Sequence, residues 1–531
     1  MANTTVKPRT SMWDRFTRRQ WSFLAAGLVF GVAQIIYMIT LWIANAQAGK
    51  DGVLKPITVT TDLGKMFRGL EVSVGNLFGF ESSLYGNWAD GFPSGGAFVP
   101  GIGWPIVGMI IGGLIVALAE RESRAWVKYP LRMLGISFLG GMIFSYGTRL
   151  AGGCTLNHLL GGIPMMNVHS TVTVVFMAIG GGLAFFIMTR LNVGQYFKHQ
   201  ETKSYCEATD TGECPAYDPT YVWYKNPWYW AAASFSILLV FVAFYGGFFN
   251  PEGLQHLKDG EIVAFSKSVD AKGWLYVLGT LLAGIVGGIG MAKSGFGTEC
   301  ALVSLEAAGS MTKNDSKYAD MGIPRITRTL MRGYLPIIGL AAAWVLTAGF
   351  VWFGWTLGAA PGFEGSLKYH LTAGNIIGGL LLGLGAVLMI GCEIRSYMRI
   401  GMGYMNTLVG FIGFAVGYLP FTLFYEGHVS FLENTVITET DKWYQFIAPN
   451  SIGTQKILYL IWVLILVAFL FFLIRMGSRN TGVTQSELRK LNTEDLQLTI
   501  DARSDDGRIA TVSAPEEVPG SHPFSEPDKT G

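Results

Sequence analysis

Two Gly-Cys steps stand where polar chemistry is least expected, directly after long apolar runs. They are Gly153-Cys154, which is followed by Thr155, and Gly391-Cys392. A thiol is a weak S–H donor with a soft, polarisable sulfur, so it can hold a soft anion and still release it. Irregular backbone at membrane depth survives only where protein or a water-filled path covers it. These two breaks therefore predict a route through a membrane that thiols line.

A third cysteine follows a comparable break, where an apolar run ends in a polar segment that contains Glu299 and Cys300. Glu393 likewise stands beside the second Gly-Cys step. A neighbouring carboxylate disfavours the thiolate, which keeps the sulfur protonated as a hydrogen-bond donor. In the alternative interpretation, the glutamates pair with Lys293 and Arg395 and only fix their loops. Cysteine is often buried for packing alone, but three cysteines at three breaks favour a functional role.

Other ionisable side chains lie close to these breaks. Such residues at membrane depth are functional candidates by default, because burying a charge there is costly. Arg149 and Arg395 rank above His158 and His169 for drawing an anion inward, although Arg149 also fits a helix end from which it snorkels to water. The residues assigned to the path are Cys154, Cys300, Cys392, Gly153, Gly391, Thr155, Arg149, Arg395, Glu299 and Glu393.

The composition is that of an integral membrane protein. Of 531 residues, 50% are hydrophobic and only 14% are charged, whereas about a quarter are charged in soluble domains. The net charge of +2 does not indicate a nucleic-acid partner. Five cysteines are too few for a disulfide scaffold, and Cys206 and Cys214 lack the partners of a zinc site. No nucleotide-binding motif appears, so we expect neither an enzyme nor a cofactor.

Apolar runs long enough to cross or largely cross a bilayer core of about 30 Å recur along the chain. They lie at 21–46, 104–119, 133–147, 170–188, 228–249, 273–292, 334–355, 373–391, 406–425 and 456–475. The first run is too long for a signal-peptide core and lacks a convincing cleavage site, so we expect it to stay as a membrane helix. The expected fold class is an all-α integral membrane protein of about ten transmembrane helices, with broken or re-entrant short helices.

Basic residues concentrate in alternate loops. With ten spans, the clusters in the N-terminal arm and at 120–132, 191–227, 310–332, 393–399 and after 475 all fall on one face. The positive-inside rule makes that face cytoplasmic, which places both termini inside and the chain in the inner (plasma) membrane. Segment 47–103 carries four basic residues on the other face, but long loops weigh little in this rule.

The two Gly-Cys steps have matching surroundings. With an offset of 238 residues (392 − 154), Cys154 falls on Cys392, and four glycines fall on glycines: Gly140 on Gly378, Gly141 on Gly379, Gly147 on Gly385 and Gly153 on Gly391. The spans before the two cysteines run in opposite directions, which predicts an inverted-topology repeat with a site near the bilayer midplane. Glycine-rich helices also match by chance, but five positions in register favour the repeat.

The expected organisation follows from these spans and loops. It comprises a basic cytoplasmic arm at 1–20, a first membrane half at 21–190 with an external segment at 47–103, a cytoplasmic loop at 191–227, a linking helix and external loop at 228–272, a second membrane half at 273–425, an external loop and last span at 426–475, and a disordered cytoplasmic tail at 476–531.

The motifs resemble those of the YeeE/YedE family of membrane transporters for sulfur compounds, whose members include thiosulfate importers. The matching stretches are GGCT at 152–155, KSGFGTECAL at 293–302 and GC at 391–392, within a resemblance that covers about 21–425. The resemblance implies an hourglass-shaped helical fold with two pseudo-symmetric halves. It also implies a central path on which cysteine thiols pass the substrate along.

This sequence departs from the family pattern at two breaks. Cys300 is displaced from the position directly after Phe296, where Gly297 stands, and no cysteine marks the break near 42–47. Two functions therefore stay open. The first is uptake of a small sulfur-containing anion, thiosulfate foremost, across the lipid bilayer. The second is a membrane subunit that docks a soluble sulfur-carrier or redox partner without conducting; the intramembrane ionisable residues favour the first.

Overall fold

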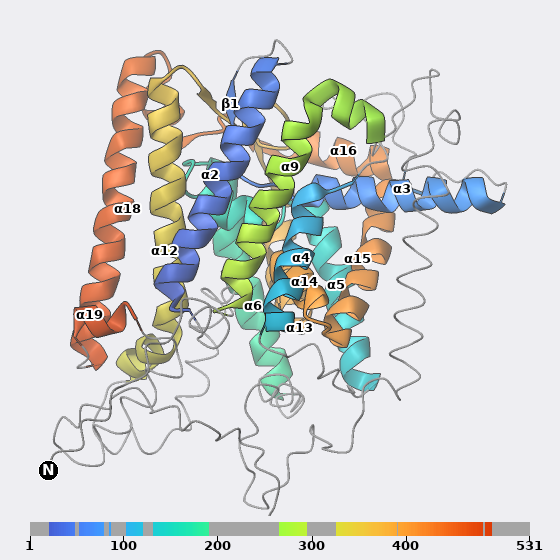
Figure 1. The fold of residues 1–531 in the computed structure, drawn as a ribbon, viewed down its shortest axis with the longest axis horizontal. Helices are drawn as coiled ribbons and strands as arrows, with labels where there is room; N and C mark the ends of the chain where they lie inside the picture. Colours follow the sequence, from blue (N-terminus) through green and yellow to red (C-terminus); the bar gives the residue numbers. More distant parts are fainter. Residues whose placement is uncertain are drawn as a thin grey trace, which may run out of the picture.

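Apolar helices account for nearly all regular structure in the computed structural model (Figure 1). The structure describes residues 21–47, 52–78, 84–85, 102–119, 131–190, 265–294, 325–389, 391–481 and 484–490. The predicted span 228–249 and the loop 191–227 lie outside these residues, as do the path candidates Glu299 and Cys300 and the pair Cys206 and Cys214.

The helices follow one another with few strands between them. They are α2 (Phe23–Gln47), α3 (Thr60–Phe78), α4 (Trp104–Ala119), α5 (Leu131–Leu150), the short π-helical turn η2 (Leu156–Gly162), α6 (Val168–Arg190), α9 (Phe265–Ala292), α12 (Arg325–Thr356), α13 (Ala373–Met389), α14 (Glu393–Gly401), α15 (Met405–Leu423), α16 (Tyr425–Asn434), α17 (Trp443–Ile447), α18 (Ile452–Thr481) and α19 (Gln485–Leu488).

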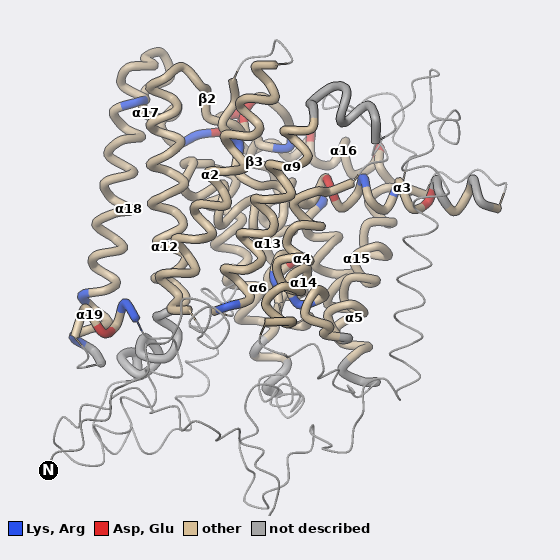
Figure 2. Tube along the Cα trace, in the orientation of Figure 1, with Lys and Arg blue, Asp and Glu red and all other residues tan. Residues whose placement is uncertain are grey.

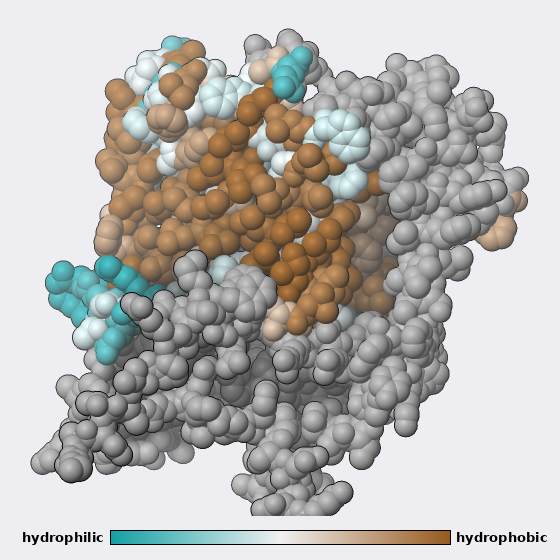
Figure 3. All heavy atoms as spheres, in the orientation of Figure 1, coloured by the Kyte–Doolittle hydropathy of each residue, from teal (hydrophilic) through white to brown (hydrophobic). Residues whose placement is uncertain are grey.

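Six spans among the described helices are long and apolar enough to cross a membrane: α2, α9, α12, α13 together with α14 (Ala373–Gly401), α15 and α18. Two shorter apolar helices, Trp104–Ala119 and Val168–Ala184, join them. A broad apolar band covers the described part of the visible face, with hydrophilic atoms at its upper edge and at the lower left (Figure 3). Lys, Arg, Asp and Glu are sparse along the helices (Figure 2). The chain is therefore a multi-pass membrane protein. Each predicted span except 228–249 coincides with a described helix.

Glycines set how closely the central helices approach. A Cβ atom added at Gly385 of α13 would lie 2.7 Å from the backbone oxygen of Gly140 in α5, and one at Gly147 would lie 3.0 Å from the backbone oxygen of Gly378. Small residues allow such backbone contact, which is how helices associate in lipid without a hydrophobic driving force between them. The glycines that match at the 238-residue offset therefore lie where α5 and α13 pack against each other, in a contact we call the glycine seam.

The loops at one end of the bundle are joined by short strands and by one buried lysine. β1 (Val53–Leu54) pairs in parallel with β2 (Ala360–Pro361), and β3 (Leu371–Thr372) pairs with β4 (Val436–Thr438) in antiparallel fashion. Lys442 Nζ donates to Asn167 Oδ1 and to the Gly362 carbonyl oxygen, both at 2.6 Å. Buried donors with acceptors at this distance hold the loops of both halves of the chain together.

Helix α3 lies within segment 47–103, for which the sequence predicted an external segment without specifying its secondary structure. It lies across the direction of the other helices (Figure 1). Asp62 in its first turn pairs with Lys65 at 3.3 Å, and Arg68 pairs with Glu71 at 2.7 Å. An acidic residue in the first turn stabilises a helix start, so Thr60-Thr61-Asp62 was a signal that hydropathy alone did not reveal.

Candidate functional site

The first Gly-Cys step forms the sharp turn between α5 and η2. Gly152 has a φ of +75°, which is in the left-handed region. A Cβ atom there would also lie 2.5 Å from the backbone oxygen of Lys368, so only glycine fits. Cys154 follows with no exposed surface, and the buried Thr155 directly precedes η2. The chain thus turns sharply and places a buried thiol at the start of a short helix.

The second Gly-Cys step has the same local plan. Cys392 is buried and extended (φ −80°, ψ 171°), and it is the N-cap of α14, which begins at Glu393. Gly391 faces the side chain of Arg395, which is half-buried on the first turn of α14. Both cysteines are free thiols in the described part of the chain. Each therefore stands at the N-terminal end of a short helix, where the helix dipole favours negative charge.

The two elements meet through Glu393. The Cys154 thiol interacts with the Glu393 carboxylate across the halves of the chain, and it lies 3.9 Å from Asn157 Oδ1 within its own element. Tyr397 donates its hydroxyl to Glu393 Oε1 at 2.6 Å. The sequence suggested Arg395 or a thiol as the neighbour of this carboxylate. The structure places the Cys154 thiol, from the other half of the chain, beside this carboxylate.

Arg149 points into the site from the end of α5. Its guanidinium carbon lies 4.7 Å from the centroid of the Tyr418 ring, which is buried. Its charge also acts on Glu393. A guanidinium over an aromatic face is held by cation–π attraction, so this contact favours Arg149 as an interior cation.

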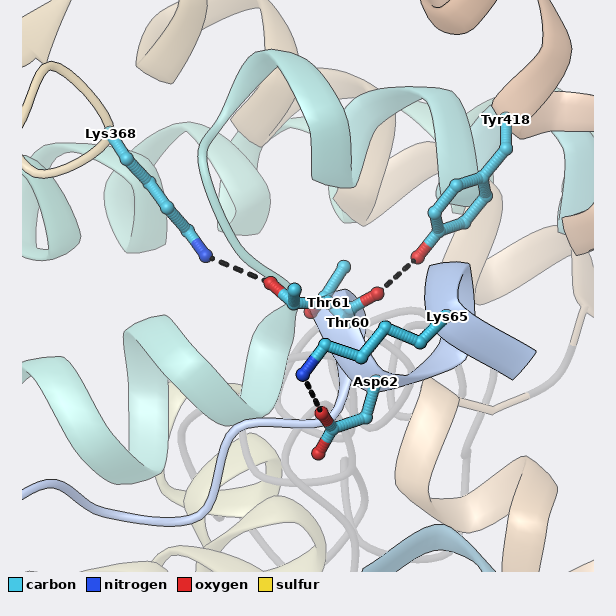
Figure 4. A network of polar contacts seen from close by, with 6 residues as sticks. All are labelled: Thr60, Thr61, Asp62, Lys65, Lys368 and Tyr418. Carbon is cyan, nitrogen blue, oxygen red and sulfur yellow. Dashed lines mark hydrogen bonds and ion pairs between the residues drawn. The ribbon is translucent and has the colours of Figure 1, made fainter. Parts of the chain in front are cut away.

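The start of α3 reaches the same place, which sequence reasoning missed. Tyr418 donates to the Thr60 backbone oxygen at 2.9 Å, and Lys368 Nζ donates to Thr61 Oγ1 at 3.2 Å (Figure 4). The Thr60 side chain lies beside the Cys154 thiol. Three helix starts, those of α3, η2 and α14, therefore converge on Cys154, and helix N-termini are natural anion-binding ends.

The histidines near the first break are linked to one another. Ser170 Oγ lies 3.1 Å from His158 Nδ1 and 3.2 Å from His169 Nε2, and both rings are buried. The Ser170 hydroxyl therefore links η2 to α6. Among the described residues, no group of three or more His, Cys, Asp or Glu side chains is arranged to hold a metal ion.

Comparison with known proteins places the chain in a family. The family described as "Sulphur transport" matches residues 1–183 and 324–501, which is more than half of the chain. The chain belongs to the sulphur transport family. This confirms the membership that the Gly-Cys motifs predicted.

A curated relative of the sulphur transport family gives a more specific likeness. The chain is 29% identical over 136 residues to a protein named thiosulfate transporter TsuA from Spirochaeta thermophila. The aligned stretch covers 25% of this chain and 37% of that relative. Together with the apolar helices, these matches identify a multi-pass membrane protein of the sulphur transport family.

Proposed function

We propose that this protein takes up a small sulfur-containing anion, most of all thiosulfate, along a central path that Cys154 and Cys392 line. The observation that carries the proposal is the meeting of the two Gly-Cys elements at Glu393. Family membership and the name of the thiosulfate-transporting relative support it. A buried thiol at the start of each short helix is the arrangement that a relay from opposite sides requires.

The site suits an anion with a soft sulfur end and hard oxygen ends. Thiosulfate has both: its terminal sulfur accepts a weak S–H hydrogen bond, and its oxygens accept backbone N–H groups and cations. Single hydrogen bonds of this kind contribute only about 1 kcal/mol net. Binding can therefore be selective and still weak enough for release, as conduction demands.

Glu393 has a distinct part in this proposal. A carboxylate beside Cys154 disfavours the thiolate, so the sulfur keeps its proton and stays a hydrogen-bond donor. It also repels an anion, which prevents tight trapping. Arg149 acts on the same carboxylate and offsets that repulsion at the narrow part of the path.

We further propose that the two halves form an inverted repeat, which the α5–α13 seam supports. The 238-residue offset carries Gly140 to Gly378 and Gly147 to Gly385. A two-fold axis that exchanges the residues of each pair would therefore relate the contact of Gly385 with Gly140 to the contact of Gly147 with Gly378. Both contacts are present, as a pseudo-two-fold axis between the helices requires.

Neighbouring helices follow the same rule. The offset carries η2 onto α14 and α6 onto α15. Helix α13 packs on α6, and α5 packs on α15. The same two-fold axis relates these two helix contacts to each other. The two cysteines then occupy equivalent places on opposite sides of the proposed midplane, which gives the hourglass-like path of about ten spans that the sequence predicted.

The proposed orientation places both termini in the cytoplasm of a cell with this protein in its inner membrane. Helix α2 begins and α18 ends at the same edge of the bundle, the lower edge in Figure 1. The basic loops predicted from the sequence assign that edge to the cytoplasm.

Uptake of labelled thiosulfate into proteoliposomes tests the transport proposal. The wild-type protein should accumulate label, and Cys154→Ala should abolish uptake while its thermal unfolding midpoint stays close to that of the wild type. Normal uptake by a well-folded Cys154→Ala protein would overturn the thiol path. The alternative, a docking subunit, predicts no uptake by either protein. It rests on residues 191–227, which lie outside the described structure, and on the tail, of which the structure describes residues 476–481 and 484–490.

A further inference from the structure

Lys368 reaches the site from the loop between α12 and α13. Its ammonium group donates to Thr61 at the start of α3 (Figure 4). Its backbone oxygen packs on Gly152, in the turn that precedes Cys154. One lysine therefore contacts both segments that position the first thiol.

A second lysine lies beside it. Lys55 Nζ is 5.9 Å and Lys368 Nζ is 5.8 Å from the centroid of the Tyr369 ring, so two ammonium groups share one aromatic side chain. The salt bridges Lys65–Asp62 and Arg68–Glu71 lie elsewhere, and within the described part of the chain neither Lys55 nor Lys368 forms one. Neighbouring like charges without a paired carboxylate favour the binding of an anion.

Lys442 shows what a structural lysine looks like in the same loops. Its ammonium group is fully buried and has two acceptors at 2.6 Å, and the charges of Glu364 and Asp441 act on it. Lys368, by contrast, is half-buried, and the groups whose charges act on it are the cations Lys55 and Arg149 together with Tyr369 and Cys154. Lys442 thus has two close acceptors and two carboxylates nearby, whereas Lys368 has a hydroxyl acceptor and two cations nearby.

We propose that Lys368 and Lys55 form an oxyanion-binding subsite beside Cys154, on the side of the loops that carry them. This inference rests on the proposed transport of a sulfur anion. The lysines bind the oxygen end of the anion, and the Cys154 thiol donates to its sulfur end. Ammonium groups bind oxyanions through charge-assisted hydrogen bonds, so affinity comes from the lysines and the preference for thiosulfate over sulfate comes from the thiol.

The protonation of Lys368 supports this assignment. Burial, together with the charges of Lys55 and Arg149, lowers the pKa of Lys368 to about 8. A bound anion favours the charged lysine, so anion affinity should fall as the pH rises through this range. The titratable groups that face Lys368 from its own loop and from the packed elements are Tyr369, Lys55, Arg149, Cys154, His158 and His169.

Equilibrium binding of thiosulfate and of sulfate to the purified full-length protein tests the subsite. Lys368→Met should weaken both anions by a similar factor of about tenfold or more, because both present the same oxygens. Lys456→Met is the matched control: it removes a lysine that lies over the Trp355 ring, and it should leave both affinities unchanged. Unchanged affinities in a folded Lys368→Met protein, or a loss confined to thiosulfate, would overturn the subsite.

The Lys368→Arg variant distinguishes the protonation of Lys368 from a purely structural role of its side chain. Arginine stays protonated at all accessible pH values, so this variant should bind anions at neutral pH and lose the decline in affinity above about pH 8. A wild-type decline that persists in Lys368→Arg would contradict the role of Lys368. Uptake is measured in parallel: binding without uptake would refute the proposed function and leave the subsite standing, whereas no binding of either anion would refute both.

Discussion

Glu393 is the residue at which the two halves of the chain meet. Its side chain is buried, and a buried carboxylate is costly unless donors and opposite charge surround it. Tyr397 supplies a hydroxyl, Cys154 a thiol and Arg149 a positive charge. The thiol and this carboxylate come from different halves of the chain, so their proximity depends on the assembly of both.

The hydroxyl of Tyr397 is predicted to stabilise an ionised Glu393. Tyr397→Phe should lower the free energy of unfolding by roughly 1.5–3 kcal/mol, because a hydrogen bond to a charged group is lost. Tyr459→Phe is the matched control: it removes a buried bond of 2.8 Å to the neutral carbonyl of Pro164 and should cost about 1 kcal/mol. Unfolding in detergent measures both, and equal losses would argue that Glu393 is neutral.

At the scale of elements, the glycine seam fixes the distance between α5 and α13. A Cβ atom at Gly385 would lie 2.5 Å from the backbone nitrogen of Phe144. Backbone atoms cannot rotate away as a flexible side chain can. The helices must separate instead, and that separation disturbs the breaks that follow each helix.

Gly385→Ala is accordingly predicted to destabilise the protein by roughly 1–3 kcal/mol, as overpacking of a tight interface does. Gly349→Ala in α12 provides the control, because nothing lies within 4 Å of its added Cβ atom. That variant should be neutral or stabilised by up to about 1 kcal/mol through helix propensity. Thermal unfolding compares the two, and a well-tolerated Gly385→Ala would contradict the seam.

Helix α3 shows why one element escaped prediction from the sequence. Hydropathy detects helices whose length matches the bilayer, whereas α3 carries Asp62, Lys65, Arg68 and Glu71. Its two ion pairs satisfy these charges locally. An element that lies across the bundle has no reason to be uniformly apolar, so its place depends on tertiary contacts such as the Tyr418 hydrogen bond.

At the scale of the whole molecule, the sequence was informative about spans and much less about the site. Apolar length predicted the helices, and the Gly-Cys breaks predicted where α5 and α13 end. The contacts of Cys154 with Glu393 and of Thr61 with Lys368 join positions hundreds of residues apart. No local pattern encodes such pairs, and they became visible only when the fold placed them together.

The proposed orientation predicts which edges of the molecule are accessible from outside the cell. In a background that lacks Cys206 and Cys214, Glu439→Cys should react with an impermeant maleimide in intact cells. Ser486→Cys, near α19 at the other edge, should react only after permeabilisation. Both residues are exposed in the structure. The reverse labelling pattern would invert the topology.

Selection of the sulfur anion by thiols is the central feature of the proposed transport. Competition uptake of labelled thiosulfate against unlabelled sulfate by Cys392→Ser tests it most directly. Serine keeps the geometry but replaces the soft sulfur with a hard oxygen, so uptake should persist while the preference for thiosulfate falls up to about tenfold. A Cys392→Ser protein that keeps the wild-type preference would contradict the account, because Cys392 would then serve only packing.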